Sequence, residues 1–493
     1  MPLSTSELKE ILDSVANALL HERGFIPSFP QSAIHEIQSL TKPRRSIDCT
    51  NRFWISIDNQ HSQDLDQITS IEPLDHHRYR LYVAISDVAS FIPIDSEVDQ
   101  IARHNTSSIY TPFKIFPMLP EKYAYGLTSL LPHEVRSAVV SEIIIESDGS
   151  YQLDQIYLAD VKNHAKLVYE EVSAWIDSGY QLTGSAWQTD QVHNQLKLHH
   201  QVAQKIAKYR MKKGALNFLL VQGEVIVEEG LPLGIREKTQ TTGHAIIENI
   251  MIASNVCTTK YFLHHQLPVL LRVVKTPKRW EKIVEIAAEK GFKLPKKPDQ
   301  KSLQNFLTHQ QKVDPVHFHD LSLTVIKLIG RGEYVLSHPK KVNPGHFDLA
   351  LIDYAHTTAP NRRYPDLMMQ RILYSHLFTD QVRPPTSVLL DVARNCTQQE
   401  EAKDKIERHL YKSFAAHVLS GEIHRSFKAI VTGSGEKGTW VRLLELPVEG
   451  KLIKGYETVD IGDHLIVRLC HVDIAKGFID FCNLGDKHET FSP

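Results

Sequence analysis

The change of pattern near residue 424 constrains the fold of this chain more than any other feature of the sequence. Before it, strand-like runs alternate with long stretches of helical periodicity, such as residues 192–213 and 385–419. After it, only short alternating strands remain, and six glycines from Gly433 to Gly462 separate them. Such strands predict a small barrel of the OB type, although an SH3-like barrel has a similar composition. The chain is therefore expected to be an α+β protein with a large mixed domain and a small C-terminal barrel.

Three segments follow from this pattern. Residues 1–48 are expected to form a short helical N-terminal segment, because apolar side chains recur at helical spacing over residues 5–21 before a Pro/Arg run. This segment is too short for a substantial core of its own. Residues 49–424 are expected to form a mixed sheet with packed helices, and residues 425–493 to form the barrel.

The net charge says little about partners, because 56 basic residues nearly balance 58 acidic ones and leave a formal charge of −2. A nucleic-acid site in such a chain has to be a local basic groove. OB barrels bind single-stranded nucleic acid through a basic face that carries aromatic rings. The barrel segment offers residues of this kind: Lys437, Trp440, Arg442, Lys451, Lys454 and Tyr456.

Several classes of protein are disfavoured by the sequence. No apolar run reaches the length of about 18 residues that a membrane-spanning helix needs, so no membrane partner is expected. The first residues lack the basic and apolar regions of a signal peptide. The five cysteines are scattered, and none belongs to a C-x-x-C pair. These features predict a cytoplasmic protein without a disulfide framework or a zinc site.

Three aspartates within nine residues, Asp58, Asp64 and Asp66, follow a strand-like run over residues 52–57. Carboxylates this close repel one another unless a cation lies between them. Mg²⁺ prefers oxygen ligands and completes its shell with water and substrate phosphates. The cluster therefore suggests a metal centre for phosphate chemistry, with a solvated acidic turn as the alternative. A calcium-binding EF-hand loop fits badly, because the required central Gly and terminal Glu are missing.

Further blocks accompany the aspartates along the chain. They lie at residues 57–67, 82–89, 108–112, 116–120, 126–130, 164–169, 214–218, 247–255 and 354–367. In content and order they resemble the ribonuclease II family of exoribonucleases, whose catalytic part is the RNB domain. The resemblance covers about residues 50–424, and the segment behind it resembles the S1-type RNA-binding barrel of that family. It implies a Mg²⁺-dependent enzyme, with Mn²⁺ as a substitute, that hydrolyses single-stranded RNA from the 3′ end to nucleoside 5′-monophosphates.

The resemblance also implies roles for individual residues. Asp58, Asp64 and Asp66 occupy metal-binding positions, and Asp66 corresponds to the aspartate on which cleavage depends most. Arg362 corresponds to an arginine at the scissile phosphate, and Arg363 lies beside it as a further RNA-binding residue. A planar, permanently charged guanidinium suits such a phosphate contact.

Aromatic residues match the parts of the family that hold the RNA. Tyr110 and Phe218 correspond to the pair that clamps the 3′-terminal nucleotides, and Tyr169 corresponds to a further ring in the RNA channel. Stacking of a base on an aromatic ring contributes roughly 1–3 kcal/mol and tolerates any sequence. Glu407 corresponds to a glutamate that reaches towards the terminal nucleotide, and Glu248 lies in a helix near the active site. Tyr110 and Glu407 are therefore expected to act in catalysis.

One departure from the family pattern bears directly on activity. Gln67 stands at a metal-binding position where the family has a second adjacent aspartate, and its amide oxygen is a ligand without charge. An alternative function is therefore that of an RNA-binding protein on an RNB scaffold, with catalysis weakened or lost. A nuclease that trims structured RNA 3′ ends is a second alternative.

Two further departures concern RNA binding. Typical members of the family carry paired cold-shock domains before the catalytic domain, and residues 1–48 are too few to form them. RNA capture is then expected to rest on the C-terminal barrel and the channel mouth, with weaker and more salt-sensitive binding. The tripeptide Ala359-Pro360-Asn361 replaces the usual Ser-Pro-Ile before the predicted phosphate-binding arginine.

Overall fold

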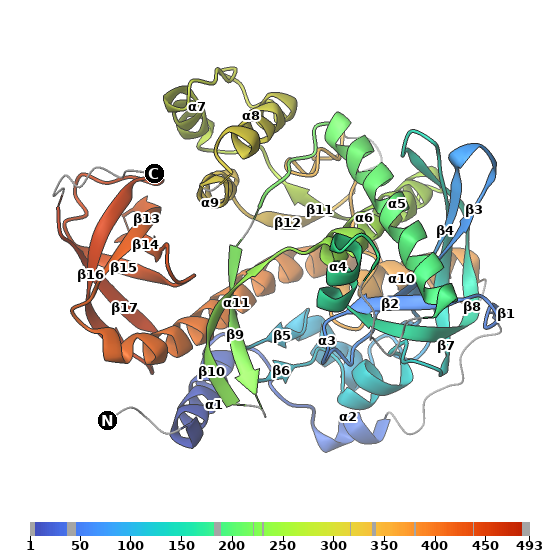
Figure 1. Cartoon of the computed structure of the whole chain (residues 1–493). Coiled ribbons are helices and arrows are strands. Elements are labelled where there is room, and N and C mark those ends of the chain that lie inside the picture. The colour runs from blue at the N-terminus through green and yellow to red at the C-terminus, as the bar shows by residue number, and fades with distance from the viewer. Residues whose placement is uncertain are drawn as a thin grey trace.

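A computed structural model describes residues 5–36, 46–181, 189–219, 221–228, 231–315, 317–337, 342–378, 381–436 and 438–485. Helices and strands alternate through the larger part of the molecule, and only strands follow the long helix α11 (Thr386–Leu419) and a single short turn of helix (Figure 1). A small β-barrel lies at one end of the molecule, and α11 runs from beneath it into the larger part. The predicted α+β architecture with a mixed sheet and a C-terminal barrel is confirmed.

The central sheet of the larger part has six strands in the order β1-β8-β2-β3-β4-β7. Their bounds are β1 (Ile47–Asp48), β2 (Trp54–Asp58), β3 (Gln67–Pro73), β4 (Tyr79–Ser86), β7 (Val135–Ile145) and β8 (Tyr151–Val168). Strand β8 pairs in parallel with β2 and antiparallel with β7, so the five longer strands close on themselves. Because β2 and β3 are antiparallel neighbours, the loop that joins them brings the predicted aspartates to one end of these strands.

Two helical layers pack against the central sheet. Helices α4 (Tyr169–Asp177), α5 (Asp190–Lys212) and α6 (Thr242–His264) bury the face that carries Ile55 and Ile57. Helices α3 (Glu97–Asn105) and α10 (Tyr364–Leu377) share a second core with Val139 and Leu158. The shorter elements of the chain are η2 (Asp75–His77), β5 (Ile109–Tyr110), β6 (Ile115–Phe116), a π-helix (Lys122–Leu127), β9 (Val221–Glu228), β10 (Leu231–Thr239), β11 (Leu270–Val274), β12 (Gly332–Leu336) and η4 (Ser420–Glu422).

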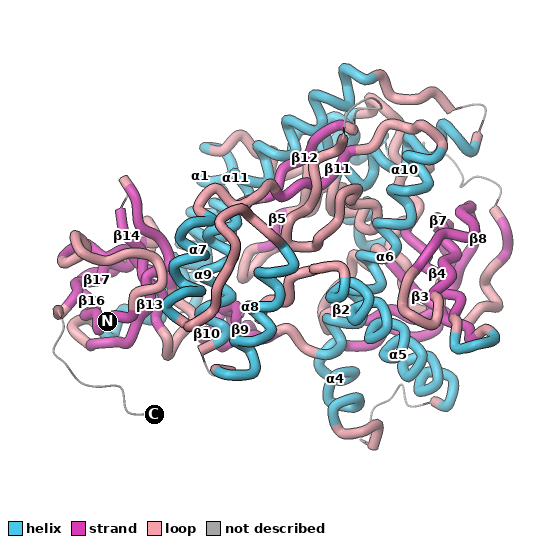
Figure 2. Tube along the Cα trace, turned by 90° about the horizontal axis from the view of Figure 1, so that it is seen from above, coloured by secondary structure: helices cyan, strands magenta, loops and turns pink. Residues whose placement is uncertain are grey.

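Three further helices form a separate layer with a core of its own. Helices α7 (Trp280–Glu289), α8 (Gln300–Val313) and α9 (Phe318–Ile329) pack around Trp280, Phe306 and Phe318. Seen from above, this layer lies between the barrel and the central sheet (Figure 2). It therefore forms part of the connection between the two ends of the molecule.

The barrel closes in the order β13-β14-β15-β17-β16. Its strands are β13 (Ser426–Gly435), β14 (Gly438–Leu443), β15 (Glu449–Lys454), β16 (His464–Asp473) and β17 (Phe478–Asn483). Phe427 and Phe481 fill its centre, and Ala415, Ala416 and Leu419 at the end of α11 complete that core. The barrel is therefore joined to the larger part by apolar packing as well as by the chain. Lys437, one of the basic residues predicted on its face, lies outside the described residues.

The N-terminal segment is helical, as predicted. Helix α1 (Thr5–Glu22) packs against α11 and β10, and α2 (Gln31–Glu36) packs against α3. Leu8, Leu12 and Leu20 of α1 are fully buried. The segment is thus part of the folded body of the protein.

One prediction from the cysteines is wrong. Cys470 and Cys482 lie on the paired strands β16 and β17, with Cα atoms 6.4 Å apart, and form a disulfide. The other three cysteines are free. The pairing depends on the register of two strands, and this register cannot be read from the spacing of cysteines in the sequence.

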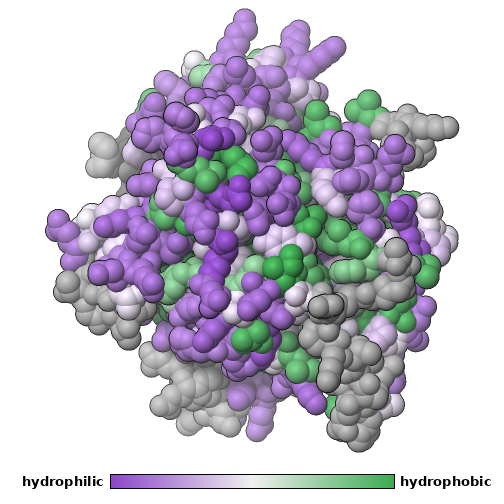
Figure 3. Space-filling model, turned by 90° about the vertical axis from the view of Figure 1, so that its right-hand side faces the viewer, coloured by the Kyte–Doolittle hydropathy of each residue, from purple (hydrophilic) through white to green (hydrophobic). Residues whose placement is uncertain are grey.

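No described helix is both long and apolar enough to cross a membrane. On the face turned to the viewer in Figure 3, hydrophilic residues predominate, and apolar residues lie among them in small groups. Scattered apolar groups of this kind are normal on globular proteins.

Candidate active site

The candidate active site begins in the loop between β2 and β3. Asp58 is the last residue of β2, Asp66 directly precedes β3, and both side chains are buried. Asp64 lies in the loop and is half-buried. Lys166 of β8 stabilises the loop, because its Nζ donates to the carbonyl oxygens of Gln60 at 2.9 Å and Ser62 at 2.7 Å. The two antiparallel strands and this lysine together hold the acidic loop at the end of β2 and the start of β3.

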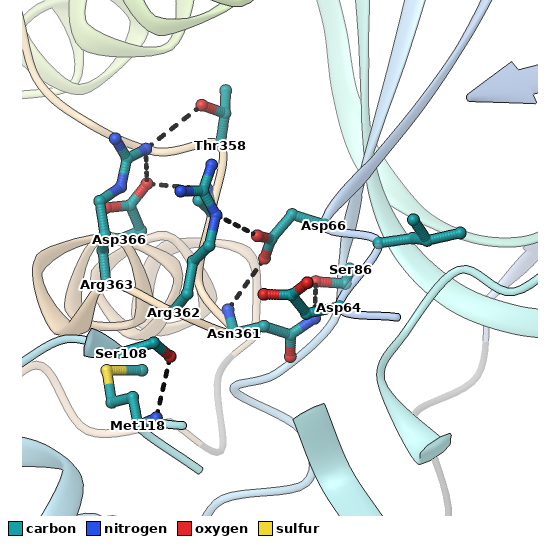
Figure 4. Close-up of polar contacts among 12 residues, drawn as sticks. Asp64, Asp66, Ser86, Ser108, Met118, Thr358, Asn361, Arg362, Arg363 and Asp366 are labelled. Atoms are coloured by element: carbon teal, nitrogen blue, oxygen red, sulfur yellow. Dashed lines mark hydrogen bonds and ion pairs between the residues drawn. The ribbon is translucent and has the colours of Figure 1, made fainter. Parts of the chain in front are cut away.

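Asp66 accepts hydrogen bonds from two residues of the segment before α10 (Figure 4). Its Oδ2 accepts a hydrogen bond from Nε of Arg362 at 2.9 Å, and its Oδ1 accepts one from the backbone N–H of Asn361 at 3.0 Å. The Asp66 side chain is 2% exposed, whereas that of Arg362 remains 41% exposed. The guanidinium therefore contacts Asp66 through one nitrogen, and the Arg362 side chain remains partly open to solvent.

Burial changes the charge state of two of the aspartates. It raises the pKa of Asp66 to about 7, where the nearby Arg362 opposes the shift and the charge of Asp64 adds to it. Burial also raises the pKa of Asp58 to about 7, with Ser56 and Lys166 opposing the shift and Asp64 adding to it. Asp64 is thus electrostatically coupled to both of its neighbours. Asp58 and Asp66 therefore keep protons at pH values at which an exposed aspartate is ionised, and full ionisation of these two carboxyl groups requires additional positive charge.

The donor chemistry fits a hard divalent cation. Oδ2 of Asp58 is buried without a hydrogen-bond partner, and such an orphaned carboxylate oxygen is available as a ligand. The described residues nevertheless contain no group of three His, Cys, Asp or Glu side chains close enough together to hold a metal. Asp66 is instead bonded to Arg362, and Asp64 to Tyr110. A shared cation would require these carboxylates to exchange partners, and the ligand set stays a prediction.

Gln67, the fourth predicted ligand, is the first residue of β3 and is partly buried. It pairs with Ile85 of β4 in the sheet register. Strand alternation places it on the face of Thr69, whose hydroxyl contacts Nε2 of His199 in α5 at 2.8 Å. Among the described residues, no hydrogen bond connects the Gln67 side chain with the three aspartates. Its metal-binding role is therefore also still a prediction.

Tyr110 connects the aspartates with α11. Its hydroxyl donates to Oδ2 of Asp64 at 2.6 Å, and its backbone N–H donates to Oε1 of Glu407 at 2.9 Å. Burial raises the pKa of the Tyr110 phenol, so the hydroxyl stays protonated and acts as a donor. Burial also raises the pKa of Glu407. The structure thus brings together five predicted site residues from four separate parts of the chain: Asp64 and Asp66, Tyr110, Arg362, and Glu407.

Tyr169 lies next to the acidic site. It is the first residue of α4 and follows Val168, which pairs with Asp58 in the sheet. Burial raises the pKa of Tyr169, and the charge of Asp58 adds to the shift. The ring stacks on His244 of α6, with centroids 3.9 Å apart and planes at 15°. One face of the ring is therefore covered, and stacking of a nucleobase would have to use the other face.

Two predicted RNA-binding residues are placed differently from the others. Phe218 follows α5 and packs against the core of α7–α9, and no contact in the described part of the chain joins it to Tyr110. Arg363 donates through Nη2 to buried Asp366 at 2.7 Å and to the hydroxyl of Thr358 at 3.5 Å (Figure 4). These bonds fix the start of α10. The predicted RNA contacts of both residues remain predictions.

Asn361 is a site residue that the sequence showed only as a departure from a motif. Its side chain is buried, donates to Oγ of Ser86 at 3.2 Å and accepts a hydrogen bond from the Thr128 hydroxyl at 2.5 Å. Its backbone N–H meanwhile binds Asp66. Asn361 therefore fixes the backbone that presents Arg362. The only sequence signal was an amide in place of an apolar residue, which by itself does not reveal its partners.

A basic groove of about 530 Å³ lies between α11 and the barrel. Among the residues that line it are Lys405, Arg408, His409 and Lys412 of α11 and Trp440, Lys451, Ile453, Lys476 and Phe478 of the barrel. Phe478 is 51% exposed, and Nζ of Lys476 lies 6.0 Å from the centroid of its ring. Of the barrel residues predicted to bind nucleic acid, the groove contains Trp440 and Lys451. The contribution of α11 was missed, because its lysines look like an ordinary solvated helix face in the sequence.

Two family models match the chain. The RNB domain matches residues 46–379, and the RNase II-type exonuclease C-terminal S1 domain matches residues 425–482. Helix α11 lies in the interval between these matches. The domain boundaries predicted at residues 48 and 424 stay predictions.

Curated relatives named ribonuclease R align with most of the chain. The protein of Aquifex aeolicus is 28% identical over 94% of this chain and 69% of its own length. That of Mycoplasma pneumoniae is 29% identical over 88% of this chain and 63% of its own length, and that of Escherichia coli is 26% identical over 94% and 60%. The chain thus spans roughly two thirds of the length of these relatives.

Solved structures show the same fold. Mycoplasma genitalium RNase R in complex with ribose-methylated single-stranded RNA superposes with a TM-score of 0.84 at 22% identity, over 96% of this chain and 78% of that one. Candida glabrata Dss1 exoribonuclease, in an active-site mutant, gives 0.72 at 18% identity over 92% and 58%. Yeast Ssd1, a pseudonuclease, gives 0.65 at 17% identity over 89% and 55%. Because a pseudonuclease shares the fold, activity has to be argued from the site.

Proposed function

The chain belongs to the RNB family of exoribonucleases, and from this premise we propose that it is a Mg²⁺-dependent 3′→5′ exoribonuclease, with Mn²⁺ as a substitute. Its substrate is single-stranded RNA, which it hydrolyses to nucleoside 5′-monophosphates. The name and the RNA complexes of its relatives support the substrate class. The chemistry of the site supports the reaction class.

The arrangement of Asp66 and Arg362 carries the proposal. A buried carboxylate that requires positive charge lies 2.9 Å from a guanidinium whose side chain is 41% exposed. Carboxylates hold the cation that phosphate chemistry needs, and a guanidinium binds phosphate oxygens in a planar, bidentate manner. A solvated acidic turn provides neither burial nor a partnered arginine. The site therefore has the two complementary charges that a phosphodiester and a metal require.

Each residue of the site has a separate role in the proposed reaction. Asp58, Asp64 and Asp66 would hold the cation, which would polarise the scissile phosphate and lower the pKa of the attacking water. Arg362 binds a phosphate oxygen through its exposed nitrogens, while its Nε keeps the bond to Asp66. Asn361 holds the arginine in place through its backbone and its buried amide. Tyr110, with its hydroxyl on Asp64, places an aromatic ring directly beside the carboxylates for the terminal nucleotide.

The basic groove provides a binding site for the RNA further from its 3′ end. Cationic side chains with exposed aromatic rings bind single strands through the backbone charge and base stacking. The groove combines Lys405, Arg408, Lys451 and Lys476 with Trp440 and Phe478. Capture of long RNA therefore rests on the seam between α11 and the barrel, and it should weaken steeply with salt.

A second candidate function is that of an RNA-binding protein without catalysis. Two observations favour it: Gln67 removes one carboxylate from the predicted ligand set, and a pseudonuclease shares the fold. The three aspartates, the arginine and the tyrosine are all retained in one connected site, which favours the enzyme. The two candidates give opposite results in a direct assay of cleavage.

The deciding experiment uses a 5′-labelled, unstructured RNA of about 30 nucleotides, incubated with the purified protein and Mg²⁺. The enzyme produces products that shorten from the 3′ end, and it does so neither with EDTA nor with DNA of the same sequence. Asp66→Asn abolishes cleavage but retains RNA binding, whereas Asp391→Asn, the same change at an exposed position of α11, leaves cleavage intact. Intact RNA over a wide range of Mg²⁺ and Mn²⁺, with binding still present, would establish the second candidate instead.

A further inference from the structure

We propose that the N-terminal helix α1 and the turn that follows it are positioning elements of the active site. They pack against the strand that carries Tyr110 and against the turn of α11 that carries Glu407. The inference rests on the proposed function, because it concerns the residues that would receive the terminal nucleotide. It assigns a catalytic contribution to a segment that touches no substrate.

The first support is apolar. Leu19 and Leu20 of α1 form one buried cluster with Ile109 of β5 and with Ile406 and Leu410 of α11. Ile109 directly precedes Tyr110, and Ile406 directly precedes Glu407. The end of α1 therefore packs against the inner sides of both elements at the place where the Tyr110 N–H donates to Glu407.

The second support is polar and comes from the turn after α1. The turn after the helix contains Gly24 at φ +75°, a left-handed conformation that suits glycine, and the side chain of Phe25 packs in the apolar cluster. The backbone N–H of Ile26 donates to Oδ1 of Asn105 at 3.0 Å, and Nδ2 of Asn105 donates to the Ile26 carbonyl at 2.8 Å. The Asn105 amide is thus bonded to both backbone groups of one residue, and this pair fixes the end of α3.

The segment from Asn105 to Tyr110 carries this support to the catalytic residues. The carbonyl oxygen of Thr106 accepts a hydrogen bond from the Tyr364 N–H at 2.8 Å. The Ser108 N–H donates to the Arg362 carbonyl at 3.1 Å. The same six-residue stretch therefore contacts the backbone of the arginine and ends at the tyrosine. A shift of this stretch would move both groups relative to Asp64 and Asp66.

The other end of α1 provides a matched control. Leu8 is 1% exposed and Leu20 is 0% exposed, so the two leucines are equally buried in the same helix. Leu8 packs with Phe414 of α11 in a second cluster, which contacts the β9–β10 hairpin and the barrel and shares the partly buried Phe113 with the first cluster. The two positions are twelve residues apart, which corresponds to roughly 18 Å along a helix. Removing either side chain should lower the free energy of unfolding by a similar amount, but only Leu20 packs against Ile109 and Ile406, the neighbours of Tyr110 and Glu407.

The experiment compares Leu20→Ala with Leu8→Ala in the full chain. Thermal unfolding, kcat and KM on a short single-stranded RNA, and affinity for a longer RNA are measured for both variants. We expect both to lower the unfolding temperature to a similar degree, whereas Leu20→Ala alone lowers kcat, by about tenfold, through misplacement of reacting groups. Affinity for the longer RNA stays unchanged, and Leu20→Met restores kcat. Equal effects of both variants on kcat would overturn the proposal.

A readout independent of catalysis separates this proposal from the proposed function. Hydrogen exchange of the Tyr110 amide reports its bond to Glu407 in the protein without RNA. The exchange should accelerate in Leu20→Ala and not in Leu8→Ala, even if the protein cleaves no RNA. If Leu20→Ala does not fold, Leu20→Val tests the same point with a smaller cavity. Unchanged protection of Tyr110 in a folded Leu20 variant would refute the positioning role.

Discussion

Asp66 should make the metal-free protein less stable as the pH rises. Its carboxyl group has a pKa of about 7 in the folded protein, whereas the ordinary value for an exposed aspartate is 3.8. Between these values the folded state keeps a proton that the unfolded state has released, so the free energy of unfolding falls with rising pH. A difference of about 3 pKa units corresponds to roughly 4 kcal/mol, and the loss is complete above pH 7.

The replacement Asp66→Asn isolates this effect, because the amide is nearly isosteric and does not titrate. Unfolding by heat or denaturant would be measured in EDTA from about pH 4 to pH 8, for the wild-type protein, the variant and Asp391→Asn. The difference in free energy between wild type and Asp66→Asn should change by roughly 4 kcal/mol across this range, in favour of the variant at high pH. Asp391 lies on the surface of α11 with a side chain 60% exposed, and its replacement should leave the pH profile unchanged.

Divalent cations should reverse the effect, because they bind the ionised carboxylates of the folded state only. Mg²⁺ should therefore raise the unfolding temperature of the wild-type protein more at pH 8 than at pH 5, and should not do so in Asp66→Asn. Parallel pH profiles of wild type and variant in EDTA would refute the reasoning. They would mean that the ion pair with Arg362 fully compensates the burial of Asp66, so that the site has no need of a cation.

Three further predictions concern binding and catalysis. Arg362→Lys should lower kcat by about 100-fold, because the lysine ammonium is a single point of charge that cannot keep the place of Nε on Asp66 and also present a planar pair of donors to the phosphate. The affinity for RNA measured by filter binding should change little. The double replacement Lys451→Ala with Phe478→Ala should weaken binding of a long RNA and flatten its salt dependence without changing kcat on a short one. Lys428→Ala, at an exposed position of β13 outside the groove, is the control and should leave binding unchanged. Gln67→Asp should lower the Mg²⁺ concentration needed for half-maximal cleavage, since it adds a charged ligand, and an unchanged requirement would remove Gln67 from the metal site.

The local features of the fold were predictable where one element determines them. The strand-like run over residues 52–57 and the helical stretch over residues 385–419 follow from periodicity, and the structure contains β2 (Trp54–Asp58) and α11 (Thr386–Leu419) there. The barrel followed from short strands and glycines, and it is confirmed. In each case the pattern of apolar residues within one segment decides the outcome, because the segment has to bury one face.

The contacts between distant segments were not predictable from periodicity. The bond between Tyr110 and Glu407 joins residues 297 positions apart, and the Cys470–Cys482 disulfide depends on the register of two strands. Lys166 was part of a recognised block, but the loop carbonyls that it binds could not be read from the sequence. Such contacts arise from tertiary packing, and a single sequence contains only the residue types that make them.

The present partners of the aspartates suggest how substrate and cation binding are connected. Asp64 is bonded to the Tyr110 hydroxyl and Asp66 to Arg362, and these two partners are the groups proposed to receive the terminal nucleotide and its phosphate. A phosphate on the other guanidinium nitrogens shares the positive charge of Arg362 with Asp66 even while the Nε bond remains, and a nucleotide at Tyr110 competes for the bond to Asp64. Both events increase the negative charge that the site leaves uncompensated, and the burial of Asp58 and Asp66 makes that charge costly. On the proposed function, arrival of RNA therefore strengthens the demand for a cation, so substrate and metal bind cooperatively at one acidic loop.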